Sequence, residues 1–328
     1  MSELALAAFA AETGSHLVSA PRTTRFRAFA RSFDVSAFMD GLARQGVRWL
    51  GRSGESFPEL LGAIHDPPPG LFLRGAAGAD VLSRPAVAVV GARSCSSYGS
   101  QVARTLGREL AAAGVVVVSG MARGVDGEAH RGALEAGGTT VAVLGCGIDR
   151  DYPAAHASLA AAIRETGLVV SEYAPGVEPA PWRFPARNRI IAGLTHATVV
   201  VEARERSGAL ITADLALEEG REVFAVPGEI TSRLSAGSNQ LLRLGAAPAT
   251  SAADVLESFG LEPAVAPLPE LGPAGEGVLA RLRDSPATAD ELAHVSGVAA
   301  AELAVVLTEL ELAGVVAEAE GLYRVVVP

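Results

Sequence analysis

The feature that most constrains the fold is an alternation of short apolar runs with amphipathic stretches, beginning at Ala86. The runs are rich in valine, and the stretches between them place apolar residues at helical spacing. Strands that alternate with helices are joined by crossover connections and form a parallel sheet covered on both faces. The pattern therefore predicts an α/β fold with a Rossmann-like parallel sheet. The predicted strands are residues 86–91, 115–119, 139–145, 167–172, 197–203 and 222–228.

Other segments flank this alternation. Residues 1–44 are predicted to form a small N-terminal helical segment. Residues 45–75 have the pattern of extra strands, a short helix and a proline-rich turn, so we expect an extended Rossmann-like domain over residues 45–260. Residues 261–272 are rich in proline and glycine and are predicted to be a linker.

Residues 273–328 are predicted to form a winged-helix domain, because three helical patterns precede a hairpin around Glu320–Gly321. Thr288 and Glu291 have the spacing of a capping box at the start of the second helix. The third helix, near 299–313, contains glutamates and no arginine, whereas a helix that reads the major groove offers cations and amides. We therefore predict a protein-contact module here, with DNA binding as the alternative.

The net charge of −10 argues at first against a nucleic-acid partner. The acidity is uneven, however, because residues 273–328 hold nine acidic residues and three arginines, a balance of −6. All 27 basic residues of the chain are arginine. The distribution therefore leaves room for a locally positive surface outside the C-terminal segment.

Nothing in the sequence indicates a membrane or an oxidising compartment. The apolar runs, such as 115–118, are too short to span a bilayer, and no basic leader precedes the first apolar residues. Two cysteines, Cys95 and Cys146, are too few for a disulfide framework or a zinc site. We predict a cytoplasmic protein without a membrane partner.

Small and basic residues follow the predicted strands, at the edge of a parallel sheet where ligands bind. Glycine lets the backbone approach an anion closely, and a following helix N-terminus presents free N–H groups to it. Together these features predict a phosphate-binding groove; the alternative is that the glycines only shape tight turns. The residues assigned to the groove are Gly91, Arg93, Ser94, Ser119, Gly120, Arg123, Gly124, Ser207 and Gly208.

The first of these turns lacks the pattern of a nucleotide cofactor site. Arg93 stands where a dinucleotide-binding turn has its second glycine, and a side chain there obstructs a pyrophosphate. No P-loop motif follows the strand either. We therefore predict no cofactor.

The segment from Trp182 to Arg189 combines three arginines with two aromatic residues at the start of a predicted helix. Arginine makes bidentate contacts to phosphate oxygens, and aromatic stacking contributes ~1–3 kcal/mol per base whatever the base is. The alternative is that Arg187 or Arg189 pairs with acids such as Glu172 and Glu202, and that the aromatic residues are core. The residues assigned to strand binding are Trp182, Arg183, Phe184, Arg187, Asn188 and Arg189.

No catalytic or metal site is visible in the sequence. Asp126, Glu128 and His130 lie close together, but they occupy the start of a predicted helix, where acidic residues are favoured by capping and by the helix dipole. Cys95 and Cys146 are interpreted as small residues at tight turns. We predict neither catalytic residues nor a metal.

With these motifs assembled, the chain resembles the DNA-processing protein DprA (Smf) family. The resemblance runs from Phe57 to about Phe259 and is most specific in the strings SGMARGVDGEAH and FPARNRIIAGL. It implies an extended Rossmann domain that binds single-stranded DNA, forms a homodimer and helps to load the RecA recombinase in natural transformation. The matching positions imply strand contacts at Arg93, Phe184, Arg187, Asn188, Arg189 and the turn Gly120–Gly124.

We therefore predict a non-enzymatic protein whose partners are single-stranded DNA, RecA and a second copy of itself. One alternative is an enzyme of the nucleotide phosphoribohydrolase type, since residues 207–228 are loosely similar to the last βα units of those proteins. The PGGxGTxxE run that carries their catalytic carboxylate is absent from this sequence. A third interpretation is a protein adaptor that acts through residues 273–328, whose deletion then abolishes all activity.

Overall fold

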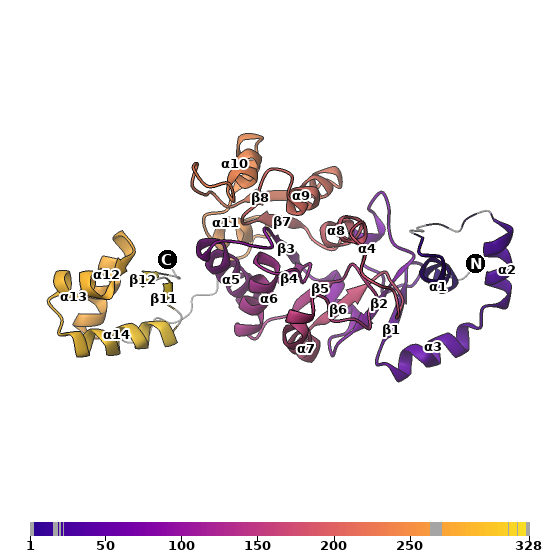
Figure 1. Ribbon diagram of the computed structural model, residues 1–328, viewed down its shortest axis with the longest axis horizontal. Helices are drawn as coiled ribbons and strands as arrows, with labels where there is room; N and C mark the ends of the chain where they lie inside the picture. Colours follow the sequence, from indigo (N-terminus) through magenta and orange to yellow (C-terminus); the bar gives the residue numbers. More distant parts are fainter. Residues whose placement is uncertain are drawn as a thin grey trace. The chain divides into compact units, whose positions relative to one another are not determined.

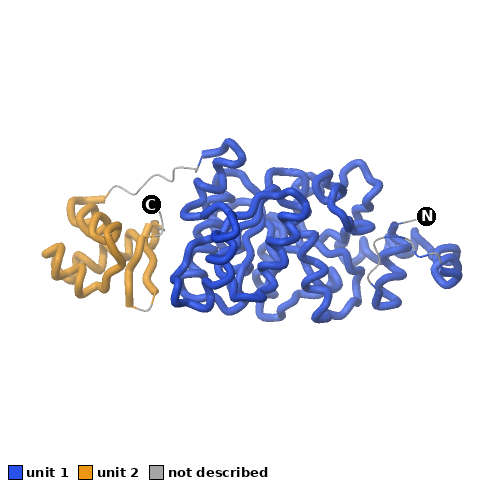
Figure 2. Tube along the Cα trace, turned by 90° about the horizontal axis from the view of Figure 1, so that it is seen from above, with its two compact units in different colours: residues 1–263 blue, residues 264–328 orange. Residues whose placement is uncertain are grey.

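The chain divides into two compact units, residues 1–263 and residues 264–328 (Figure 2). The computed structural model describes residues 3–15, 19, 21, 23–262, 271–313, 315–319 and 321–325. Most of the expected linker, residues 263–270, lies outside the described residues.

Within the described residues, nine strands of the first unit form one sheet in the order β1-β2-β6-β5-β4-β3-β7-β8-β9. The strands from β6 to β9 in this order are parallel, while β1 and β2 run antiparallel at one edge. The six predicted strands are confirmed as β3 to β8, and the extra strands expected in residues 45–75 are β1 and β2. The strands are β1 (Arg48–Gly51), β2 (Gly70–Arg74), β3 (Ala86–Val90), β4 (Val116–Ser119), β5 (Thr140–Val143), β6 (Leu168–Ser171), β7 (Ala197–Val200), β8 (Glu222–Ala225) and β9 (Ala247–Pro248).

Helices cover both faces of this sheet (Figure 1). The alternation of side chains along β3 shows why, since Val87 and Val89 pack with α5, α6 and α11, while Ala88 and Val90 pack with α8 and α9. Both faces of the central strands are therefore buried, as the continuous apolar runs predict. The helices are α4 (Glu59–Gly62), α5 (Ser97–Ala112), α6 (Val125–Glu135), α7 (Ala157–Thr166), α8 (Arg183–Gly193), α9 (Gly208–Glu218), α10 (Ala236–Arg243) and α11 (Ala252–Glu257).

Helices α5 and α6 approach each other closely through glycine. An added Cβ on Gly107 of α5 would collide with the carbonyl oxygen of Ala129, and one on Gly132 of α6 would collide with that of Arg104. The two backbones therefore pack against each other with no side chain between them at these points.

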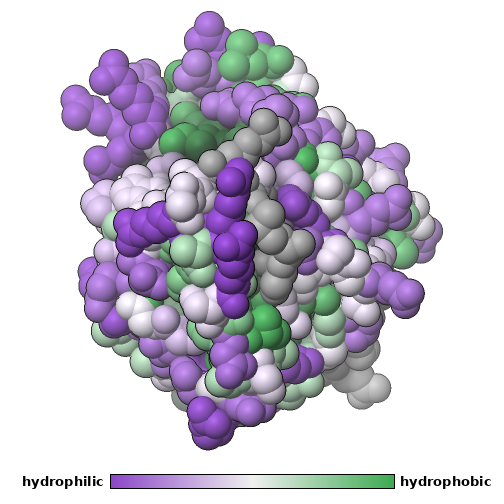
Figure 3. Space-filling model, turned by 90° about the vertical axis from the view of Figure 1, so that its right-hand side faces the viewer, coloured by the Kyte–Doolittle hydropathy of each residue, from purple (hydrophilic) through white to green (hydrophobic). Residues whose placement is uncertain are grey.

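The expected N-terminal helical segment consists of α1 (Glu3–Thr13), α2 (Thr24–Ser32) and α3 (Val35–Arg44). Leu4 and Ala7 of α1 belong to the same hydrophobic cluster as Phe72 of β2, so α1 shares the core of the sheet. Seen from this end, the surface carries mostly hydrophilic side chains with scattered hydrophobic ones (Figure 3).

The second unit has the three helices and the hairpin expected of a winged helix. Its helices are α12 (Pro273–Asp284), α13 (Ala289–Ser296) and α14 (Ala300–Leu312), and its strands are β10 (Ala287–Thr288), β11 (Val316–Ala319) and β12 (Leu322–Val325). Thr288 and Glu291 form the predicted capping box. Glu320 of the expected hairpin turn lies outside the described residues. The described helices include none with the length and apolar character needed to cross a bilayer.

Candidate nucleic-acid interface

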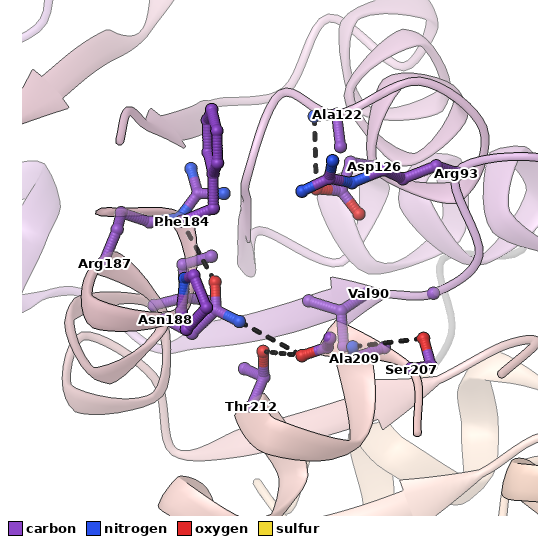
Figure 4. Close-up of a pocket in the computed structure, with 14 residues that line it drawn as sticks. Val90, Arg93, Ala122, Asp126, Phe184, Arg187, Asn188, Ser207, Ala209 and Thr212 are labelled. Atoms are coloured by element: carbon purple, nitrogen blue, oxygen red, sulfur yellow. Dashed lines mark hydrogen bonds between the residues drawn. The ribbon is translucent and has the colours of Figure 1, made fainter. Parts of the chain in front are cut away.

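The strand order creates a crevice at the carboxyl ends of β3 and β7. The chain runs from β3 through β4 and β5 to β6 on one side, and then returns to place β7, β8 and β9 on the other side of β3. Loops leave this point in opposite directions, which is where open α/β sheets bind ligands. A pocket opens here between the loops after β3 and β4, the start of α9, and α8 (Figure 4).

Seven of the sequence-predicted residues line this pocket. They come from three separate segments, and the fold brings them together because α8 lies over the carboxyl ends of the strands. The seven are Gly91, Arg93, Phe184, Arg187, Asn188, Ser207 and Gly208.

The start of α9 forms one wall of the pocket. Ser207 caps the helix, its Oγ accepting from the backbone N–H of Ala209 at 3.3 Å. Asn188 of α8 donates from Nδ2 to the carbonyl of Gly208 at 3.1 Å and so fixes α8 to this helix start. The first turn of α9 therefore faces the pocket as a rigid helix N-terminus, which favours an anion.

Arg93 and Phe184 form the opposite wall. The side chain of Arg93 is exposed, and its Cζ lies 5.3 Å from the centroid of the Phe184 ring. Both side chains lie across the pocket from Ser207 and Thr212 (Figure 4). A cation and an aromatic ring are thus presented side by side at the surface.

Arg187 lies beneath this surface and is only 4 % exposed. Its Nη1 donates to the carbonyl of Gly120 at 2.8 Å and also to the carbonyl of Val143, and its Nε donates to Oδ1 of Asn188 at 3.3 Å. The guanidinium therefore joins the loop after β4, the end of β5 and α8, and only part of it reaches the pocket.

Burial is the largest influence on the pKa values of Arg187 and Asp126, which lie beneath the surface of the pocket. It lowers the pKa of Arg187 to about 10, although the neighbouring Asp126 carboxylate opposes the change. It likewise raises the pKa of Asp126 above its ordinary value, with Arg187 opposing. Gly120 separates the two groups, since an added Cβ would fall 2.5 Å from Nη2 of Arg187 and 2.6 Å from Oδ2 of Asp126. The glycine is required by this close approach.

Arg189 is committed to an ion pair, which is the alternative that the sequence left open. Its Nη1 and Nη2 donate to the two carboxylate oxygens of Glu172 at 2.8 and 2.7 Å, and its Nε donates to the carbonyl of Asp66 at 2.9 Å. Residues two positions apart point to opposite sides of a helix, so Arg187 and Arg189 cannot both face the pocket. The sequence predicts that Arg189 binds phosphate, whereas in the structure its guanidinium is paired with Glu172.

Arg183 is also engaged within the protein. Its Cζ lies 4.9 Å from the ring centroid of Trp182 and 5.3 Å from that of Tyr173, and it donates to the carbonyl of Glu178. The second expected acid, Glu202, binds no arginine of α8 and instead accepts from the backbone N–H and Oγ of Ser96 at 2.8 and 2.6 Å. It thereby holds the loop that carries Arg93.

The remaining predicted residues lie outside the pocket lining. Ser119 donates internally to the carbonyl of Val89 at 2.6 Å, and Gly124, with φ +75°, allows the loop after β4 to pass close to Ala92. Arg123 is exposed on that loop. Ser94 lines an adjoining hollow, which shares Arg93 and Ser207 with the pocket.

That hollow contains two arginines that sequence reasoning did not assign to the site, Arg204 and Arg206. Both are exposed, and Arg206 adopts a left-handed conformation with φ 72°. Their position directly after the predicted strand 197–203 was the available signal. With Arg93, they set three arginines against one carboxylate, Glu205, so the lining of the hollow has a positive balance.

The acidic and histidine residues at the start of α6 have separate internal partners. Asp126 accepts from the backbone of Ala122 at 3.2 Å, and Glu128 pairs with Arg131 at 2.6 Å. His130 is buried with Nδ1 2.7 Å from Oγ1 of Thr140, and its burial lowers the pKa to about 3. Among the described residues, no three His, Cys, Asp or Glu side chains are grouped as metal ligands.

Two family descriptions match the sequence. Residues 48–260 match the family described as DNA recombination-mediator protein A, and residues 262–321 match the DprA winged helix domain. The chain is 47% identical over 209 residues to DNA processing protein DprA of Streptococcus pneumoniae, covering 62% of this chain and 72% of that protein. It is 38% identical over 318 residues to Protein Smf of Escherichia coli, covering 91% and 82%.

Solved structures are similar as well. The X-ray structure of DprA from Streptococcus pneumoniae aligns with a TM-score of 0.66 and 38% identity over 78% of this chain and 92% of that chain. A structure of DprA from Helicobacter pylori, described for its unique single-stranded DNA binding mode, aligns with a TM-score of 0.59 and 31% identity over 65% and 95%.

Proposed function

Because the chain belongs to the DNA recombination-mediator protein A family, also named DprA or Smf, we propose that it acts in DNA processing by binding single-stranded DNA at the crevice between β3 and β7. One observation carries the proposal. An exposed arginine, a partly exposed aromatic ring and a helix N-terminus line one pocket at the switch point of the sheet, at Arg93, Phe184 and Ser207. This combination suits a ligand that has both phosphates and unpaired bases.

In this proposal the phosphates lie along the cationic hollow. Arg93, Arg204 and Arg206 supply charge-assisted hydrogen bonds, and the positive end of the α9 dipole faces the same phosphates. Arg187 acts from below, positioning Asn188 and the loop after β4. The groove is locally positive although the chain as a whole carries −10.

Bases then stack at Phe184, on the side that Arg93 leaves free when it turns to a phosphate. Stacking accepts any base, and paired bases of a duplex cannot reach such a ring without unpairing. The site therefore favours single strands over duplex and has little sequence preference.

Two partners extend the proposal. The family is described as a recombination mediator, and we propose that the bound strand is passed to the RecA recombinase. We also propose that two copies of the chain associate, so that two grooves hold one strand with greater avidity. Light scattering of the chain alone and with a strand tests the association.

Binding in this proposal involves no covalent chemistry. Asp126, the carboxylate that lines the pocket, is already engaged by the backbone of Ala122 and lies beside Arg187. Incubation with nucleoside monophosphates and a search for free base tests the enzymatic alternative. Release of base would contradict the proposal.

The test is a salt-dependent titration of a labelled oligo-dT strand and a duplex of equal length. We expect tighter binding of the strand, with affinity falling steeply as salt rises. Arg93→Ala should weaken binding and reduce the slope of the salt dependence by about one. The control is Arg243→Ala, which removes an exposed arginine from the end of α10. Unchanged affinity in a folded Arg93→Ala protein would contradict the proposed site.

A further inference from the structure

Phe184 is one member of a longer stack. Tyr152, in the loop between β5 and α7, lies with its ring centroid 5.4 Å from that of Phe184 and its plane tilted by 25°. Arg93 lies over the same Phe184 ring at 5.3 Å. Three side chains, two from loops and one from the first turn of α8, therefore form one stacked row, Tyr152 to Phe184 to Arg93.

The exposure of the two rings differs. Phe184 is only partly exposed, because it contacts both Tyr152 and Arg93. Tyr152 is 41 % exposed, so it offers more open aromatic surface than its partner. A flat ligand group that approaches this row has an accessible aromatic ring at its Tyr152 end.

The loop holds Tyr152 in place from both sides. Asp151 accepts from Nη1 of Arg164 on α7 at 2.6 Å, and the ring of His156 donates from Nδ1 to the carbonyl of Met121 at 3.0 Å. These contacts restrain the backbone that carries Tyr152, so its ring loses less conformational freedom when a ligand stacks on it.

From this geometry we propose that Tyr152 is a second base-stacking residue of the strand site. The proposal rests on the proposed function and names a further contact of the same site. A base stacks on the exposed ring of Tyr152, continuing the row through Phe184, while the neighbouring phosphate lies beside Arg93. The strand thus extends across the loop after β5 as well as the loops after β3 and β7.

A simpler role for Tyr152 would be to support Phe184, and substitutions separate the two. Tyr152→Phe keeps an aromatic ring and should bind oligo-dT as the wild type does. Tyr152→Leu keeps apolar volume against Phe184 but has no flat ring. Base stacking predicts that Tyr152→Leu and Tyr152→Ala both lose roughly tenfold in affinity for oligo-dT.

The full chain is titrated with oligo-dT and with an abasic strand of equal length, and thermal unfolding checks that each variant is folded. On the abasic strand, Tyr152→Ala and the wild type should have equal affinity, because only the phosphates remain to be bound. The salt dependence on oligo-dT should keep its slope, since no cation is removed. Tyr98→Ala is the control, because Tyr98 is a similarly exposed tyrosine, at 38 %, outside the stacked row.

Wild-type affinity of Tyr152→Leu for oligo-dT would overturn the proposal and leave Tyr152 as a support. An equal loss on the abasic strand, or the same loss in Tyr98→Ala, would also overturn it. If the wild type itself fails to bind oligo-dT, the proposed function fails as a whole. If the wild type binds oligo-dT and Arg93→Ala weakens that binding, but the Tyr152 variants bind as the wild type does, then this inference fails and the proposed function stands.

Discussion

Two arginines of α8 show how much depends on the direction of a single side chain. Arg187 points toward the strand ends and donates to backbone carbonyls, and Arg189 points the other way and pairs with Glu172. Both are buried, but only Arg187 lines the pocket. We therefore expect loss of Arg187 to affect strand binding and loss of Arg189 to affect the stability of the fold.

Arg189→Ala should lower the stability of the fold by about 3–5 kcal/mol, because it leaves the buried carboxylate of Glu172 without its partner. Urea unfolding measures the loss. The control is Arg150→Ala, which breaks a much more exposed pair with Glu178 and should cost about 0–1 kcal/mol. A stable Arg189→Ala protein with weakened strand binding would place Arg189 in the site after all.

His130 should make stability depend on pH. Its pKa is lowered from 6.5 to about 3 in the folded protein. Between these two pH values the imidazole is protonated in the unfolded chain and neutral in the folded chain. Its stabilising contribution is therefore present above pH 6.5 and is lost as the pH falls toward about 3. In this window the unfolding free energy of the wild type should fall with decreasing pH more steeply than that of His130→Asn, by up to about 1.4 kcal/mol per pH unit. Urea unfolding over a pH series measures both slopes, and parallel curves would contradict the prediction.

At the scale of residues, the sequence predicts which residues lie near the site better than it predicts which side chains contact one another. Arg93, Phe184 and Ser207 were selected because they follow strands or begin a helix, and they do line the pocket. The pairing of Arg189 depends on which side of α8 meets Glu172, and charge spacing alone does not determine that side. Tyr152 was not selected, because its contact with Phe184 joins segments far apart in the sequence.

At the scale of elements, the closest packing lies between α5 and α6 and not at the proposed site. Gly107 and Gly132 are the points where the two backbones approach each other. Gly120 lies in the loop that leads into α6 and Asp126 lies in the first turn of α6, so the position of this helix affects the groups beneath the pocket.

Gly132→Ala should destabilise the first unit by about 1–3 kcal/mol, since the new methyl group meets the backbone of Arg104 and the helices must separate. The midpoint of urea unfolding measures the effect. The control is Gly41→Ala on α3, where the new methyl group would meet only Nη2 of Arg44, at 3.8 Å. This control should be neutral or gain up to about 1 kcal/mol from its higher helix propensity. Equal stability of the two variants would contradict the close packing.

Most elements were predictable because their signals are local. The six valine-rich runs became β3 to β8, and the capping box at Thr288 marked the start of α13. The two-residue strands β9 and β10 were not predicted, because a pair of residues shows no periodicity. Their pairing depends on neighbouring strands that the local sequence does not specify.

At the scale of the whole molecule, the charge is divided unequally. Residues 273–328 carry a balance of −6 out of −10, and the exposed glutamates of α14 belong to this segment. The arginines of the proposed strand site all belong to the first unit. An acidic winged helix suits a protein partner better than a phosphate backbone.

Removal of residues 264–328 should leave strand binding intact, with affinity equal to or several-fold tighter than that of the full chain at low salt. The reason is that the deletion removes negative charge and none of the pocket residues. The oligo-dT titration measures the change, and circular dichroism checks that the shortened chain is folded. Complete loss of binding in the folded remainder would favour the adaptor interpretation.

The buried guanidinium of Arg187 has a consequence for how the site meets its ligand. It joins the loop after β4, the end of β5 and α8 through hydrogen bonds between protein groups alone. The framework of the site is thus held by the protein's own contacts, and we expect most of the order gained on association to come from the ligand. Substitution of the exposed side chains above this framework would change which ligand binds, but it would not change where on the sheet the ligand binds.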